Sequence, residues 1–140
     1  MGDKLPSSVR CSRSARFVPG ADTWIASDSA TSSYSGVFED DGETAYFYAV
    51  DRAKSDGSIL DAVHIYDVAS LSDRERESEA EIVWSSDGLK AGLLINERLH
   101  AIIDFEQRKA YCRRNFPLPG GEWRAEKRDL WRDELATLLE

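Results

Sequence analysis

Three Asp-Gly pairs separate the apolar segments of this 140-residue chain. They are Asp41-Gly42, Asp56-Gly57 and Asp87-Gly88, and each follows or precedes a short run rich in aromatic and β-branched residues. Asp-Gly in this setting is typical of the tight turn of a β-hairpin, because glycine adopts a positive φ without steric cost. The pairs therefore predict an antiparallel sheet.

The clearest predicted hairpin surrounds the first pair, with strands over residues 36–39 and 44–50. A two-residue loop requires positive φ at both Asp41 and Gly42 and places Phe38 opposite Ala45. The same pattern predicts further strands over 23–26, 59–68, 82–84, 89–96, 99–105 and 110–115. The serine-rich residues 27–35 are predicted to be a loop, and the charged residues 70–79 a mobile loop or a solvated turn of helix.

Both faces of the predicted sheet are apolar. With two-residue loops, one face is expected to present Ile82, Trp84, Leu89, Leu93, Ile95 and Ile102. The other is expected to present Val83, Leu94, Ala101, Ile103, Phe105 and Cys112. Such a sheet needs cover on both sides or must curl around itself.

A C-terminal helix is the predicted cover. Residues 122–139 follow a Pro- and Gly-rich break and place large apolar residues at helical spacing, namely Trp123, Leu130, Trp131, Leu135, Leu138 and Leu139. The expected fold class is therefore α+β, a mostly antiparallel meander sheet of about seven to eight strands with one amphipathic helix packed on it. The alternative for this helix is that it docks a partner.

The chain is expected to form one domain over residues 22–140, preceded by a loose basic arm over residues 1–21. No segment approaches the roughly 20 apolar residues that span a bilayer, and the first residues do not resemble a secretory signal. We therefore expect a cytoplasmic protein without a membrane partner, in which Cys11 and Cys112 are free thiols.

The net charge is −8 and unevenly distributed. Residues 22–105 contain 18 acids and 6 bases, whereas residues 106–132 contain 4 acids and 8 bases. An acidic body repels nucleic acid, whose binding depends on Lys and Arg, and it attracts basic partners. The charge therefore favours a protein partner and argues against nucleic acid, although acidic surfaces also serve solubility alone.

One cluster of catalytic residue types is predicted on the sheet: His100, Asp104, Tyr111 and Arg113. A hairpin turning at residues 107–108 would place Tyr111 opposite Asp104 and Arg113 opposite Ile102. An imidazole beside a carboxylate suits a general base, and an arginine suits an anion. The alternative is a hydrogen-bonded polar cluster without catalytic function.

Other candidate groups have structural explanations. Cys112 is expected to be an inert buried thiol on the face away from His100, and His64 a histidine satisfied by hydrogen bonding. The acidic turn at residues 39–43 lacks the ligand spacing of a calcium loop. The sequence contains no nucleotide-binding glycine loop. It therefore predicts no metal site and no cofactor.

Four segments resemble an uncharacterised bacterial family, domain-of-unknown-function family 2251. They are residues 38–48, 65–66, 84–88 and 104–117, and the resemblance extends over about residues 34–118. It implies a small bacterial protein and supplies no activity, cofactor or catalytic residue.

The function expected from these features is that of a non-enzymatic binding protein, of immunity or regulatory type, whose acidic surface meets a protein partner. One alternative is a small enzyme or small-molecule binder that uses the His/Asp/Tyr/Arg cluster. Another is a homodimer joined through an uncovered sheet face or edge.

Overall fold

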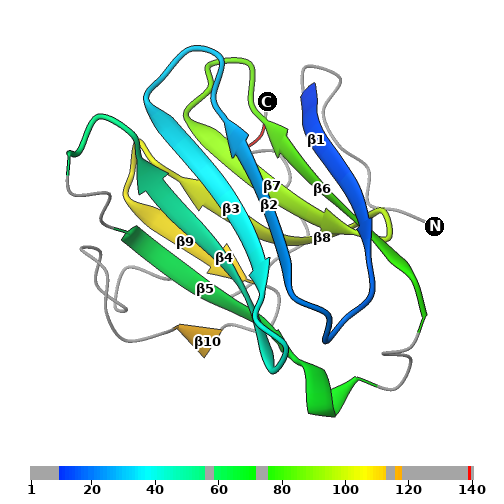
Figure 1. Cartoon of the computed structure of the whole chain (residues 1–140). Coiled ribbons are helices and arrows are strands. Elements are labelled where there is room, and N and C mark those ends of the chain that lie inside the picture. The colour runs from blue at the N-terminus through cyan, green and yellow to red at the C-terminus, as the bar shows by residue number, and fades with distance from the viewer. Residues whose placement is uncertain (1–9, 56–58, 72–75, 113–115, 118–138, 140) are drawn as a thin grey trace.

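The computed structural model describes residues 10–55, 59–71, 76–112, 116–117 and 139, and these form two five-stranded antiparallel sheets (Figure 1). Sheet A consists, in spatial order, of β1 (Arg10–Phe17), β6 (Ser78–Trp84), β7 (Lys90–Ile95), β8 (Arg98–Asp104) and β9 (Lys109–Cys112). Sheet B consists of β10 (Phe116–Pro117), β5 (Ile59–Asp67), β4 (Thr44–Asp51), β3 (Tyr34–Asp40) and β2 (Thr23–Asp28).

The sheets pack face to face around one apolar core. Phe38 and Phe47 of sheet B are fully buried there, together with Ile82 and Leu93 of sheet A. Their neighbours along each strand point away from this core, because successive side chains of a strand alternate between its faces. Each sheet thus covers the inner apolar face of the other.

The predicted α+β fold class is wrong, because the described chain forms a β-sandwich. It crosses between the sheets three times, between β1 and β2, between β5 and β6, and between β9 and β10. Its one described helix is the short 3-10 helix η1 (Val68–Ser70). No described helix has the length and apolar character needed to cross a membrane.

The predicted C-terminal helix over residues 122–139 lies outside the described residues, apart from Leu139. Leu139 is fully buried in a second apolar cluster on the outer face of sheet A. Its partners there come from β6, β7, β8 and β9, and they are Val83, Leu94, Leu99, Ile102 and Tyr111.

Part of the predicted N-terminal arm is a strand. Residues 10–17 form β1, which pairs with β6 from Arg10 opposite Trp84 to Phe17 opposite Ser78. Phe17 is buried and meets Phe38 edge to face, with 5.2 Å between the ring centroids. Residues 1–9 lie outside the described part of the chain, so the domain boundary stays a prediction.

The first hairpin is confirmed, but its register is not the predicted one. Phe38 lies opposite Phe47 instead of Ala45. The loop is longer because the Asp41 carboxylate accepts hydrogen bonds from the backbone N–H groups of Glu43 and Thr44. Gly42 has a φ of +100°, whereas Asp41 is not among the residues with positive φ.

A β-bulge reverses the faces predicted for β8 and β9. The turn between β7 and β8 uses Asn96 and Glu97, both at positive φ, and the register then shifts so that His100 is an extra residue. Each extra residue inverts the alternation. Ala101 and Ile103 therefore join Ile82 in the core, whereas Ile102 lies in the outer cluster.

Of the predicted serine-rich loop, only residues 29–33 form the hairpin loop between β2 and β3, and this loop binds the turn between β6 and β7. The hydroxyl groups of Ser29 and Ser32 donate to the carbonyl of Gly88 at 2.8 and 3.0 Å. Thr31 donates to the carbonyl of Asp87 at 2.8 Å. These bonds hold one end of sheet B against sheet A.

We predict that Gly88→Ala lowers the free energy of unfolding by about 1–3 kcal/mol, measured by chemical denaturation. A Cβ at Gly88 would collide with the hydroxyl oxygens of Thr31 and Ser29, and Gly88 has a φ of +70°. Gly42→Ala is the matched control, because its φ is also positive but its nearest neighbour, Asp22 Oδ1, is 3.6 Å away. Equal losses in the two variants would contradict the role given to the loop contact.

Candidate binding surface

The outer face of sheet B presents a row of aromatic side chains. The register aligns Trp24 of β2 with Glu39 of β3, Glu39 with Tyr46 of β4, and Tyr46 with His64 of β5. The adjacent row, Ile25 with Phe38, Phe47 and Val63, is buried in the core. Because side chains alternate, the Trp24 row points outward.

The aromatic rings of this face are close enough to form one surface. Tyr48, from the next outward position of β4, has its ring centroid 6.4 Å from Trp24 and 5.8 Å from Tyr46. Tyr46 lies 6.2 Å from the imidazole of His64. We call Trp24, Tyr46 and Tyr48, which are exposed or partly buried, the aromatic face; the neighbouring His64 is buried.

Trp24 is the most accessible part of the aromatic face. It is 62% exposed, the largest fraction among the exposed large apolar side chains of the described residues. It sits on β2, at the edge of sheet B. A large exposed aromatic side chain beside other aromatic rings is typical of an interaction surface.

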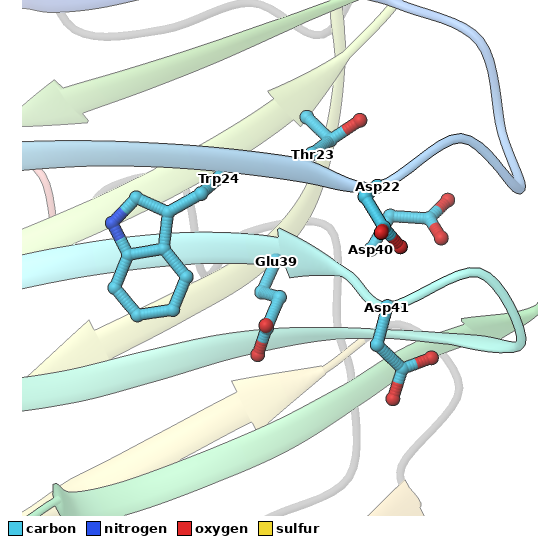
Figure 2. Close-up of a pocket in the computed structure, with 6 residues that line it drawn as sticks. All are labelled: Asp22, Thr23, Trp24, Glu39, Asp40 and Asp41. Carbon is cyan, nitrogen blue, oxygen red and sulfur yellow. The ribbon is translucent and has the colours of Figure 1, made fainter.

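An open hollow of about 430 Å³ adjoins Trp24 and is lined by carboxylates. Besides Trp24 and Thr23, its lining consists of Asp22, Glu39, Asp40 and Asp41. Figure 2 shows the side chains of Trp24, Glu39 and Asp41 extending to the same side of β2 and β3. The hollow therefore combines an aromatic ring with negative charge.

Tyr48 holds Glu39 in place. Its hydroxyl donates to Glu39 Oε1 at 2.7 Å. Burial raises the pKa of Tyr48 above its ordinary value, and the hydrogen bond and negative charge of Glu39 raise it further. The phenol thus stays protonated and keeps donating, which fixes the Glu39 carboxylate beside the hollow.

The Asp41 carboxylate is also held as an anion. The backbone N–H groups of Thr44 and Glu43 hydrogen-bond to it and lower its pKa. Hydrogen bonds to the charged form favour that form. Asp41 therefore contributes a fixed negative charge to the rim of the hollow.

Asp40 has a structural role instead. It is 1% exposed and accepts hydrogen bonds from Gly20 N, Gly42 N and the Tyr66 hydroxyl. Burial, with the Asp40 hydrogen bond and charge, raises the pKa of Tyr66. These three donors satisfy the buried carboxylate. Asp40 therefore holds the end of β3 in place and is not a ligand-binding group.

Every charged residue of strands β2, β3 and β4 is an acid. Residues 22–51 contain no Lys or Arg, and their acids are Asp22, Asp28, Glu39, Asp40, Asp41, Glu43 and Asp51. All except Asp40 are at least partly exposed. A cation over an aromatic ring and beside carboxylates is stabilised by both groups. The surface is thus suited to cationic side chains such as those of Lys and Arg.

The predicted catalytic cluster does not have the predicted register. Tyr111 lies opposite Ile102, and Lys109 lies opposite Asp104. Asp104 is buried and accepts a hydrogen bond from Gln107 N at 3.0 Å. His100 is the partly buried bulge residue, and Arg113 lies outside the described residues. A catalytic role for these four residues stays a prediction.

Cys112 and His64 are both buried and each makes a hydrogen bond. Cys112 is a buried free thiol that donates to the carbonyl of His64 at 2.9 Å. In sheet A it lies opposite Ala101 of β8. His64 Nε2 is 2.9 Å from Asp67 Oδ1. In the described part of the chain, no three His, Cys, Asp or Glu residues are placed to hold a metal ion.

The sequence analysis did not single out the aromatic face, although two signals for it are present. Tyr46 and Tyr48 alternate with the buried Phe47 and Ala49, and Trp24 precedes the buried Ile25. The absence of any base from residues 22–51 is the second signal. Both became informative only when the register placed three strands side by side.

We predict that Glu39→Gln lowers the pKa of Tyr48, because it removes the adjacent negative charge. Phenol absorbance during alkaline titration measures this change, and subtraction of the Tyr48→Phe curve isolates Tyr48. The raised pKa contributes stability that is complete below the ordinary value of 10.0 and is lost as pH rises further. Glu43→Gln is the control; equal titration curves for the two variants would contradict the Glu39–Tyr48 pairing.

The comparisons with known proteins agree with the resemblance seen in the sequence. An uncharacterised protein of Haemophilus influenzae is 42% identical over 83 residues, which cover 59% of this chain and 52% of the relative. The chain thus spans about half the length of that relative. No solved structure matches the present chain. A family model matches residues 17–140, and the chain belongs to this family of uncharacterised proteins conserved in bacteria, DUF2251.

Proposed function

We propose that this protein is a non-enzymatic binding protein whose aromatic face and surrounding carboxylates take a basic segment of a partner protein. The observation that supports the proposal is the exposed Trp24 beside the carboxylate-lined hollow. Aromatic side chains are enriched at protein interfaces, and they bind cations through the negative face of the ring.

The geometry suggests how a cationic side chain binds. Its aliphatic stem packs on Trp24, and its charged end enters the hollow between Glu39 and Asp41. Glu39 Oε1 is already bonded to Tyr48, and Asp41 is bonded to two backbone N–H groups, so neither carboxylate has to be ordered by the ligand. Preorganised groups bind with a smaller entropic cost.

The charge distribution favours the same class of partner. The described strands β2, β3 and β4 carry acids and no base, so a basic segment meets attraction along them, except at Asp28, which pairs with Arg52 at 3.6 Å. Complementary charge raises the association rate and selects against acidic competitors. Attraction of this kind weakens as salt concentration rises.

We predict that Trp24→Ala weakens binding of a short peptide in which arginine alternates with threonine by about three- to thirtyfold. Fluorescence anisotropy of the labelled peptide measures the affinity. Val18→Ala, which truncates another exposed apolar residue, is the matched control and should leave the affinity unchanged.

The charge contribution is tested in the same assay. Glu39→Gln should weaken the complex, whereas Glu79→Gln, at an exposed position of sheet A, should not. A peptide that alternates glutamate with threonine should not bind. Equal affinity of the arginine peptide for the wild type, Trp24→Ala and Glu39→Gln proteins would refute the proposed function.

A further inference from the structure

The strand that carries Trp24 has one unpaired edge. β2 pairs with β3 on one side, and among the described strands nothing pairs with its other side. The free edge lies next to the aromatic face, because Trp24 belongs to both. An open edge presents backbone donors and acceptors that can pair with another strand.

The hydrogen-bond pattern shows which residues of β2 present these groups. Residues of an antiparallel pair alternate between those that bond to the partner strand and those whose N–H and C=O point away from it. Ser29 N donates to Tyr34 O at 2.9 Å, which makes this position a bonded pair. Along the register of β2 with β3, the bonded residues are then Thr23, Ile25 and Ser27.

The remaining residues of β2, Trp24, Ala26 and Asp28, therefore direct their backbone groups to the free edge. The pairing of β3 with β4 agrees with this assignment. Asp41 N donates to Thr44 O, so Ser35, Val37 and Glu39 are the residues of β3 that bond to β4, and the alternate residues of β3 bond to β2. The side chains of Trp24, Ala26 and Asp28 are all exposed. A strand added here would place its backbone on these three residues.

The other sheet edges carry features that discourage such pairing. β1 has a bulge between Cys11 and Arg13 and contains basic residues, β9 contains Lys109, and β10 contains Pro117. Bulges, charges and proline are the usual protection of edges. β2 keeps a regular register over its 6 residues and contains no proline, glycine or base.

Charge identifies the occupant of this edge. β2 is flanked by Asp22, its neighbour on β3 is Glu39, and it ends in Asp28, whose carboxylate pairs with Arg52. A second copy of β2 would bring the same acids alongside these, which is unfavourable for opposed strands. An extended basic segment would instead place its cations beside them.

We propose that the extended basic segment of the partner adds to sheet B as an antiparallel or parallel strand alongside β2. This inference rests on the proposed function and specifies how the partner binds. Hydrogen bonds to Trp24, Ala26 and Asp28 hold the backbone of the segment, and alternate cationic side chains reach Trp24 and the hollow. In β-strand addition generally, backbone hydrogen bonds give affinity and pockets for alternate side chains give specificity.

Ala26→Pro tests the inference, because it removes a backbone donor at the free edge and no bond between β2 and β3. Proline is tolerated at the solvent side of an edge strand. We expect the arginine–threonine peptide to bind Ala26→Pro about tenfold more weakly, which corresponds to the loss of one or two hydrogen bonds. Ala26→Ser keeps the donor and should bind within about twofold of the wild type.

A modified peptide gives a second test that does not depend on the folding of a variant. N-methylation of alternate backbone nitrogens keeps every charge but removes the donors of one edge of the peptide. Of the two possible methylation patterns, one should abolish binding to the wild-type protein and the other should preserve most of it.

The outcomes distinguish this inference from the proposed function. Unchanged binding of Ala26→Pro and of both methylated peptides, with weak binding of Trp24→Ala, would overturn strand addition and leave the proposed function standing. Unchanged binding of Trp24→Ala as well would overturn both. A dimer in light scattering that Ala26→Pro converts to a monomer would show that a second copy occupies the edge, and it would also overturn the inference.

Discussion

The packing of Phe38 and Phe47 against sheet A determines what the rest of sheet B can present. These side chains are fully buried, at neighbouring positions of β3 and β4, and Ile25 and Val63 continue their row on β2 and β5. Burial of each large apolar side chain contributes roughly 1.5–3 kcal/mol, so this row cannot turn outward. Trp24, Glu39, Tyr46 and His64 must then face away from the core, and the binding surface is a consequence of the core.

Buried polar contacts fix the two sheets relative to each other. Trp84 Nε1 of sheet A donates to Ser27 Oγ of β2 at 2.9 Å, and the thiol of Cys112 donates to the carbonyl of His64 on β5. A buried polar group that loses its partner costs more than the bond itself contributes. The positions of β2 and β5, at opposite sides of the aromatic face, are therefore tied to sheet A.

Local patterns predicted the strands better than their arrangement. The expected strand over 59–68 is β5, and the Asp87-Gly88 turn joins β6 to β7 with Ile82 and Leu93 on one face, as predicted. The pairing of β1 with β6 joins residues far apart in the sequence, which no local periodicity reports. The bulge at His100 and the side-chain bonds of Asp41 changed registers through single residues. The aromatic face depends on three registers at once, and for this reason it emerged only from the structure.

The hydrogen bonds that hold Asp41 and Glu39 have a consequence for the conditions under which this surface keeps its charge. Asp41 has a lowered pKa, and so has Asp51 at the end of β4, where Ser33 donates to its carboxylate. Both remain ionised in mildly acidic surroundings, and Tyr48 remains neutral in alkaline ones. At physiological ionic strength the field of such charges extends about 8 Å. Asp41 and Asp51 therefore contribute a short-range negative potential that is insensitive to moderate changes of pH.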